Sequence, residues 1–277
     1  MVRAPLRLLG AFAGLAVLAA VVSCGKVGPP QPPLGRTEAR PNQLTAVQVG
    51  PTIRLSWGAP NLDLRENVGS AVRRADVYRL RQTRDAVPLG IGDQFEEAAD
   101  IVGFLDYETL KRQLKGEDRL AFDDQLDLAQ ASDLSNTRFQ YAVRYVDERG
   151  RPQGFSNIVS VEPVPGIARP PTELRATQQQ DQVVLTWTPP VENIDGSVPA
   201  QVIGYNVYRA KPAAERLGRP INDRPLADPT FTDRRFLYQT PYVYVVRSVS
   251  QGPDQTVESS DSDRLELTPR DTFAPSA

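Results

Sequence analysis

The sequence predicts an all-β fold, with two tandem β-sandwiches following an N-terminal export signal. Three observations support this prediction: short segments in which apolar and polar residues alternate, an internal repeat, and an apolar N-terminal run that ends in a cysteine. Alternation with a period of two is typical of half-buried strands. Short strands separated by turn residues, without strong helical periodicity, favour sandwiches over other architectures.

The N-terminal segment has the three parts of a secretory signal. Arg3 and Arg7 precede an apolar run over residues 8–22, and small residues lead into Cys24. This order of charge, apolar core and small residues is that of a signal peptide. The run is about 15 residues long, shorter than the roughly 20 that a membrane-spanning helix needs. An ordinary signal peptide with an incidental cysteine and a short membrane anchor are the alternatives.

Small residues followed by a cysteine resemble the lipobox of bacterial lipoproteins. The resemblance implies that residues 1–23 are a signal peptide that is removed, and that Cys24 becomes the first mature residue and carries lipid. Gly25 after the cysteine, in place of an aspartate, is similar to the family signal for outer-membrane delivery in Gram-negative bacteria. The expected location is therefore the cell envelope, lipid-anchored in the outer membrane, on its periplasmic or its surface face.

A proline-rich tether is predicted over residues 24–40. Prolines occupy four of the five positions in residues 29–33, which favours polyproline II, an extended spacer of about 3 Å per residue. The tether is therefore expected to hold the first folded domain away from the bilayer.

The remaining chain contains two copies of one pattern. Three motifs of the first copy occur again in the second, and the tryptophan motifs and the Val-Tyr-Arg triplets share one offset. The matching segments are residues 40–46 with 169–176, 53–60 with 183–190, and 77–79 with 207–209. A constant offset over separate motifs indicates a duplicated domain.

Each copy resembles a fibronectin type III domain, the second more closely. The pattern is Leu-x-Trp-x-x-Pro, then Gly-Tyr-Asn-Val-Tyr-Arg, then Tyr-x-Tyr-x-Val. The resemblance implies immunoglobulin-like sandwiches in which Trp57 and Trp187 fill the core and Tyr242 closes a corner by hydrogen-bonding back to the chain. Phe139 stands at the corner position of the first copy, so that domain is expected to lack this bond.

The predicted first domain spans residues 41–164 and contains an insertion near 83–120. The second domain spans 168–270, and a disordered tail over 271–277 follows. Apolar residues fall at helical spacing over 95–102 and over 107–114, with Asp106 as a possible N-cap of the second run. We expect one or two short helices or an extra edge strand. The insertion is either a functional surface or a lid over an exposed sheet edge.

The composition argues against catalysis and nucleic-acid binding. The chain has no histidine, and Cys24 is its only cysteine, so the usual general base and a free thiol are missing once Cys24 is acylated. No phosphate-binding glycine loop or Gly-x-Ser-x-Gly elbow occurs. The 32 basic and 34 acidic residues lack the positive excess of a nucleic-acid footprint. We expect no enzymatic activity, no cofactor, no metal and no nucleic-acid partner.

Three residue groups have the composition of a site but also a simpler structural explanation. They are the acids Asp123, Asp124 and Asp127, the acids Asp254, Glu258, Asp261 and Asp263, and the tyrosines Tyr78, Tyr205 and Tyr208. The acids lack the spacing of a calcium loop, so we expect solvated turns. The tyrosines could form a sugar platform, but packing is the expected role.

The best interface candidate is the loop that follows the first tryptophan strand. Its residues mix apolar and charged groups and are Asn61, Leu62, Asp63, Leu64, Arg65 and Glu66. Binding loops of such folds cluster at one end of the sandwich.

The expected function is that of a lipid-anchored envelope lipoprotein acting as a non-catalytic binding or scaffold protein through two fibronectin type III domains. Its partners would be the membrane, through the lipid on Cys24, and an envelope protein or polysaccharide. The alternative is an accessory subunit of a carbohydrate-processing or export complex that docks through the insertion.

Overall fold

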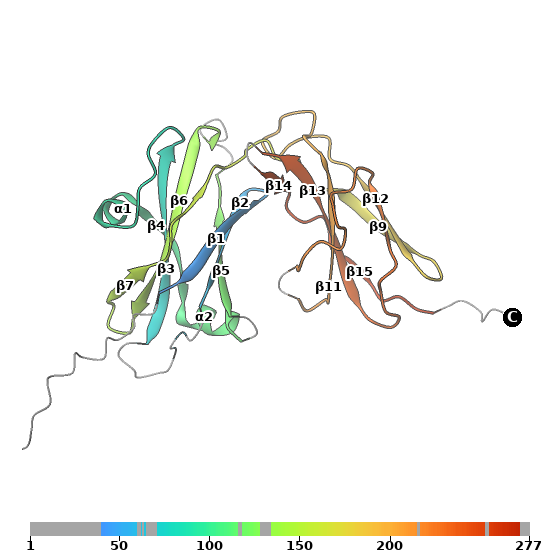
Figure 1. The fold of residues 1–277 in the computed structure, drawn as a ribbon. Helices are drawn as coiled ribbons and strands as arrows, with labels where there is room; N and C mark the ends of the chain where they lie inside the picture. Colours follow the sequence, from blue (N-terminus) through green and yellow to red (C-terminus); the bar gives the residue numbers. More distant parts are fainter. Residues whose placement is uncertain are drawn as a thin grey trace, which may run out of the picture. The chain divides into compact units, whose positions relative to one another are not determined.

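The computed structural model describes residues 40–271, except 60–61, 63, 65–70, 116–117, 128–133, 215–216 and 253–254. The predicted signal peptide, Cys24, nearly all of the tether and the tail from residue 272 lie outside the described residues. Within the described residues strands predominate, and the α-helices are two short ones. The predicted all-β sandwich class is confirmed (Figure 1).

The first half of the chain forms two antiparallel layers. One layer contains β1 (Asn42–Val49), β2 (Thr52–Gly58) and β5 (Arg119–Gln125). The other layer consists of β3 (Val72–Thr83), β4 (Asp100–Asp106), β6 (Thr137–Asp147), β7 (Pro152–Phe155) and β8 (Val159–Val161). Its strand order is β4–β3–β6–β7, and β8 also pairs with β6. The helices are α1 (Asp93–Ala98) and α2 (Tyr107–Gln113). Helix α1 lies on the side of the second layer that faces away from β1, β2 and β5 (Figure 1).

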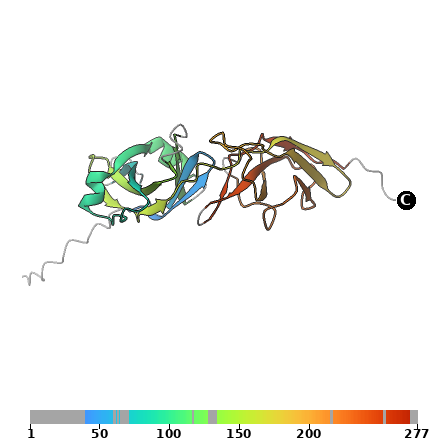
Figure 2. The same ribbon diagram turned by 90° about the horizontal axis from the view of Figure 1, so that it is seen from above.

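The second half repeats the two-layer plan without the helices. A three-stranded sheet contains β9 (Thr172–Gln178), β10 (Val183–Thr188) and β12 (Thr230–Asp233). The facing strands are β11 (Gly204–Ala210), β13 (Tyr242–Gln251), β14 (Thr256–Glu258) and β15 (Leu265–Leu267). Figure 2 shows the strands of each half from above, surrounding a separate interior.

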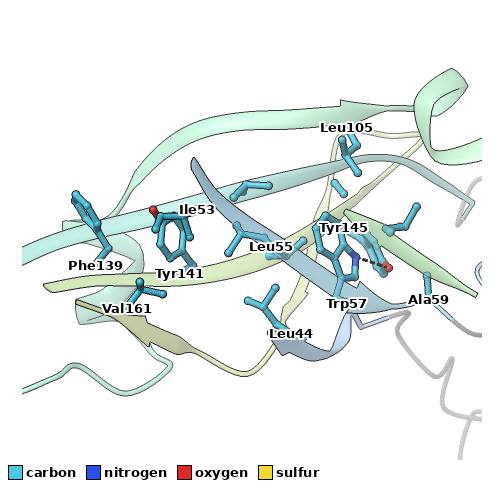
Figure 3. Packing of buried hydrophobic residues seen from close by; sticks show 14 of the residues in the cluster. Leu44, Ile53, Leu55, Trp57, Ala59, Leu105, Phe139, Tyr141, Tyr145 and Val161 are labelled. Carbon is cyan, nitrogen blue, oxygen red and sulfur yellow. Dashed lines mark hydrogen bonds between the residues drawn. The ribbon is translucent and has the colours of Figure 1, made fainter. Parts of the chain in front are cut away.

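Both predicted core tryptophans are buried, each in the hydrophobic core of its own half. In β2 the side chains of Ile53, Leu55 and Trp57 are fully buried, whereas the intervening Arg54 is exposed, as the period-two alternation predicts (Figure 3). Trp57 Nε1 donates a hydrogen bond to the Tyr145 hydroxyl at 3.2 Å.

The second core differs from the first in its polar contacts. Trp187 packs edge-on against Tyr205 at a ring separation of 5.3 Å, and its Nε1 has no hydrogen-bond partner among the described residues. The Tyr242 hydroxyl accepts a hydrogen bond from the backbone N–H of Leu237 at 3.1 Å. Phe139, at the matching position of the first half, has no hydroxyl with which to make this contact.

A buried carboxylate links the two layers of the first half. Asp124 of β5 is 8% exposed. It accepts hydrogen bonds from the Tyr141 hydroxyl of β6 and from Arg79 of β3, both at 2.7 Å. The Arg79 guanidinium also stacks over the Phe139 ring, 5.0 Å from its centroid. The prediction of a solvated turn at Asp123 and Asp124 is therefore wrong, because both residues lie in β5 and one of them is buried.

The second half contains the same arrangement. Asp233 of β12 is 3% exposed. It accepts hydrogen bonds from the Tyr244 hydroxyl at 2.8 Å and from Arg209 at 2.6 Å. Arg209 in turn stacks over Tyr242 at 4.8 Å. The arginine of each Val-Tyr-Arg triplet thus has the same role in both copies: it pairs with a buried aspartate of the opposite layer.

The two halves are in contact through backbone pairing, and the segment between β8 and β9, here called the linker, is hydrogen-bonded to the first half. Strand β1 pairs in parallel with β14 at Val49 and Glu258, and the Gly50 N–H donates to the Glu258 carbonyl at 2.7 Å. Gly50 has φ +55°, and a Cβ there would lie 2.9 Å from the backbone nitrogen of Ser260. The linker is held by Gln48, whose side-chain amide bonds both the N–H and the carbonyl of Val164, at 2.8 and 3.0 Å.

Removing the first buried carboxylate is expected to destabilise the protein strongly. Asp124→Ala leaves the Tyr141 hydroxyl and Arg79 without their shared acceptor, and we expect a loss of about 2–4 kcal/mol in the free energy of unfolding. The matched control is Asp123→Ala, because the Asp123–Arg54 pair is 49% and 44% exposed. Such a surface pair is expected to contribute less than about 1 kcal/mol. Urea denaturation measures both variants, and equal effects would contradict the assigned role of Asp124.

Four buried tyrosines predict a loss of stability at high pH. The residues are Tyr141, Tyr145, Tyr208 and Tyr244, and burial raises the pKa of each hydroxyl. A neighbouring carboxylate raises the pKa further in all of them except Tyr145. The folded chain therefore holds the neutral phenol while the unfolded chain ionises near pKa 10. The contribution of these tyrosines to the free energy of unfolding is therefore fully present below about pH 10 and is lost as the pH rises above it. Urea midpoints and tyrosinate absorbance, followed as the pH is raised, test this. Ionisation of these tyrosines in a chain that stays folded and equally stable is the contrary result.

Candidate interaction surface

The insertion near residues 83–120 builds a surface that the second half lacks. It contains both of the expected alternatives, because α1 and α2 are short helices and β4 is an extra edge strand. The helix predicted from the spacing over residues 95–102 is only partly confirmed. Helix α1 ends at Ala98, and Val102 lies in β4.

Helix α1 is fixed to the outer face of the sheet by an aromatic cluster. Phe95 is fully buried and contacts the Phe155 ring edge-on at 5.8 Å, and Tyr78 contacts the same ring at 5.0 Å. Glu96 forms an ion pair with Arg144 at 2.5 Å. These contacts give the insertion a small core of its own, so that α1 is a fixed part of the surface.

Helix α2 begins at the predicted cap and closes the edge of β5. The Thr109 N–H donates to the Asp106 carboxylate at 2.8 Å, and this bond lowers the pKa of Asp106. Leu110 is fully buried in the core. The Gln113 side chain accepts from the Ala121 N–H at 2.8 Å and donates to the Ala121 carbonyl at 3.1 Å. The amide thus pairs with β5 as a neighbouring strand would.

The edge of β4 carries exposed apolar side chains. Strand β4 ends its sheet, and among the described residues β3 is the strand that pairs with it. Ile101 is 53% exposed and Phe104 is 56% exposed, whereas Leu105 is buried in the core. Gly103 lets the Phe122 ring of β5 approach closely, since a Cβ there would lie 2.4 Å from it.

A groove of about 370 Å³ lies between β4 and β5. Its lining includes Leu105, Phe122, Arg54, Asp123 and Arg112. Arg54 forms two hydrogen bonds to Asp123, at 2.8 and 2.9 Å. Arg112 has no ion-pair partner among the residues that the structure describes; its guanidinium contacts the Thr109 hydroxyl at 3.4 Å. The surface of the groove is mostly polar, with Leu105 and Phe122 as its large apolar side chains.

The predicted interface loop is only partly described. Asn61, Asp63, Arg65 and Glu66 lie outside the described residues. Leu62 and Leu64 are half-buried and pack against the first core. The Tyr107 hydroxyl of α2 donates to the Leu64 carbonyl at 2.9 Å. The structure thus connects this part of the loop to the insertion.

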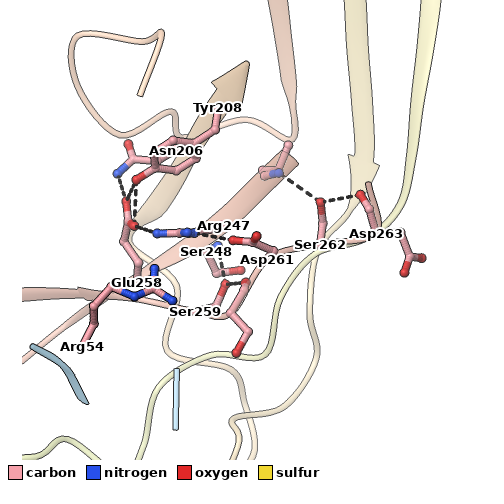
Figure 4. A network of polar contacts seen from close by, with 12 residues as sticks. Arg54, Asn206, Tyr208, Arg247, Ser248, Glu258, Ser259, Asp261, Ser262 and Asp263 are labelled. Carbon is pink, nitrogen blue, oxygen red and sulfur yellow. Dashed lines mark hydrogen bonds and ion pairs between the residues drawn. The ribbon is translucent and has the colours of Figure 1, made fainter. Parts of the chain in front are cut away.

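The acids of the last hairpin are used in a polar network (Figure 4). Arg247 donates to Glu258 at 2.8 Å and to Asp261 at 2.7 Å. Glu258 also accepts from the Tyr208 hydroxyl at 2.6 Å and from Asn206 at 2.5 Å. The carboxylates of Glu258 and Asp261 therefore already have donors within the protein. Asp254 lies outside the described residues, and Asp127 has a partner.

Neither a metal site nor a sugar platform emerges from the described residues. No group of three or more acidic or cysteine side chains within them could hold a metal ion. Tyr78, Tyr205 and Tyr208 are 9%, 4% and 5% exposed, which is too little for their rings to stack on a sugar. The predicted packing role of these tyrosines is confirmed.

Comparisons with known proteins leave the chain without an assigned family. No family model matches it. A solved structure described as "Myokine structure" is similar over 37% of this chain and 98% of its own, with 15% sequence identity and a TM-score of 0.29. At this similarity the match assigns neither a family nor a function. Within the part of the chain that the structure describes, no helix is long and apolar enough to cross a bilayer.

Proposed function

We propose that the protein is a lipid-anchored binding or scaffold protein of the bacterial cell envelope. The observation that carries the proposal is the order of its parts: a signal segment ending at Cys24, a proline-rich stretch and then two β-sandwich halves. A lipidated cysteine provides attachment, and a polyproline spacer provides reach. The folded halves are then available for contact with a partner in the envelope, either a protein or a polysaccharide.

The two halves are proposed to be fibronectin type III domains. The repeated tryptophan motif supports this, since Trp57 and Trp187 each lie in a buried core. The hydrogen bond from the Leu237 N–H to the Tyr242 hydroxyl is in keeping with the corner expected in the second copy.

The proposed role is non-catalytic. The chain contains no histidine, and the carboxylates of Asp123, Asp124, Glu258 and Asp261 accept hydrogen bonds from arginine or tyrosine. A general acid or base needs a group that can exchange a proton with a substrate. Carboxylates already paired with arginine are poorly suited to that task.

A second candidate is an accessory subunit of an envelope complex, for carbohydrate processing or export. The insertion favours it, because α1, β4 and α2 form a fixed surface with exposed apolar residues and an adjacent groove. Exposed apolar side chains beside a groove are typical of protein interfaces.

Replacing the cysteine tests the anchor. We expect Cys24→Ala to abolish lipidation and to move the protein from the membrane fraction to the soluble fraction, because its only lipid attachment site is lost. The matched control is Ser23→Ala, which keeps a small residue before the cysteine and is expected to leave the protein in the membrane. Fractionation of cells followed by immunoblotting measures both. A Cys24→Ala protein that stays in the membrane fraction contradicts the proposed anchor.

A further inference from the structure

We infer that the open edge of β4 binds an extended segment of another protein, which adds as a strand to the β4–β3–β6–β7 sheet. The inference rests on the proposed binding function and identifies the kind of partner. The segment would have alternating apolar residues and one carboxylate. Its backbone would pair with β4, and its side chains would contact both the groove and the exposed face of the strand.

The edge of β4 is open, whereas the edges of β5 and β1 are each closed at one residue by a side-chain amide. An edge strand presents unpaired N–H and carbonyl groups that can pair with another chain. At Ala121 the edge of β5 is closed by the Gln113 amide. At Leu44 the edge of β1 is closed in the same way by Asn157, which makes bonds of 2.9 and 3.0 Å. Among the described residues no side-chain amide covers β4 in this manner.

Strand β4 borders the groove of about 370 Å³ at Leu105. Phe122 of β5 is also part of the lining of this groove. The register with β3 is regular from Gly103 to Asp106, because the bulge falls before Gly103. A strand that pairs with this stretch would direct alternate side chains over the groove.

The outer face of β4 presents two exposed apolar side chains. Ile101 and Phe104 are more than half exposed and lie on β4 itself. The remaining side chains of an added strand would lie beside them, where cross-strand apolar pairs stabilise a sheet. The apolar residues of the partner segment would therefore lie on the face that adjoins Ile101 and Phe104.

Charge indicates what the bound segment carries in addition to its apolar residues. Arg112, at the groove, has no ion-pair partner among the described residues. A carboxylate on the bound segment would supply one.

Site-specific photocrosslinking in intact cells tests the inference with the full-length, lipid-anchored protein. Benzoylphenylalanine is incorporated at position 104, where an aromatic side chain already stands. The matched controls carry the same group in place of Val191 or Leu237, which are 77% and 68% exposed and lie in the second half. We expect adducts from position 104, and mass spectrometry should map them to an extended partner segment that contains Asp or Glu among alternating apolar residues.

A charge variant examines the carboxylate contact. Arg112→Glu is expected to reduce the adduct yield at position 104 by about tenfold, whereas Arg112→Lys should retain most of it. Adducts that map to a second copy of this chain, or that do not respond to Arg112→Glu, overturn the inference. Adducts at position 191 or 237 but not at 104 overturn it as well, while the proposed binding function stands. Adducts at none of the three positions contradict both the inference and the proposal of a protein partner.

Discussion

The carboxylates of Asp124 and Asp233 each hold the two layers of one sandwich together. Each lies in one layer and accepts hydrogen bonds from a tyrosine and an arginine of the other. Charge-assisted hydrogen bonds of this kind are short and strong, and a buried carboxylate without them would be costly. The contact matters particularly in a chain with a single cysteine, because no intramolecular disulfide can join its layers.

The two halves share this polar link and differ in what surrounds it. In the first half, the chain between β3 and β5 forms α1, β4 and α2, and Phe95 gives this insertion its own apolar anchor. In the second half the same face of the sheet is covered by a smaller cluster around Tyr208, Val243 and Val245. The insertion thus gives the first half a surface that the second half lacks.

Much of the fold and the position of the insertion could be predicted from local patterns, whereas contacts between residues distant in the sequence could not. Alternation along β2 revealed a strand with Trp57 inward, the repeat revealed the duplication, and Asp106 was recognisable as a helix cap. Asp124 resembled a polar turn, because its partner Arg79 is distant in the sequence and burial by tertiary pairing leaves no local signal. A local sequence signal did exist for β4, because its short apolar run between Asp100 and Asp106 fits an edge strand better than a helix face.

The proposed docking role requires that the edge of β4 is open in the free protein and covered in the assembled complex. Hydrogen–deuterium exchange can compare the recombinant protein with the complex isolated from solubilised envelopes. We expect that amides over residues 100–106 exchange readily in the free protein and become protected in the complex, while those of α1 do not change. Unchanged exchange in β4, with new protection confined to the second half, would contradict it.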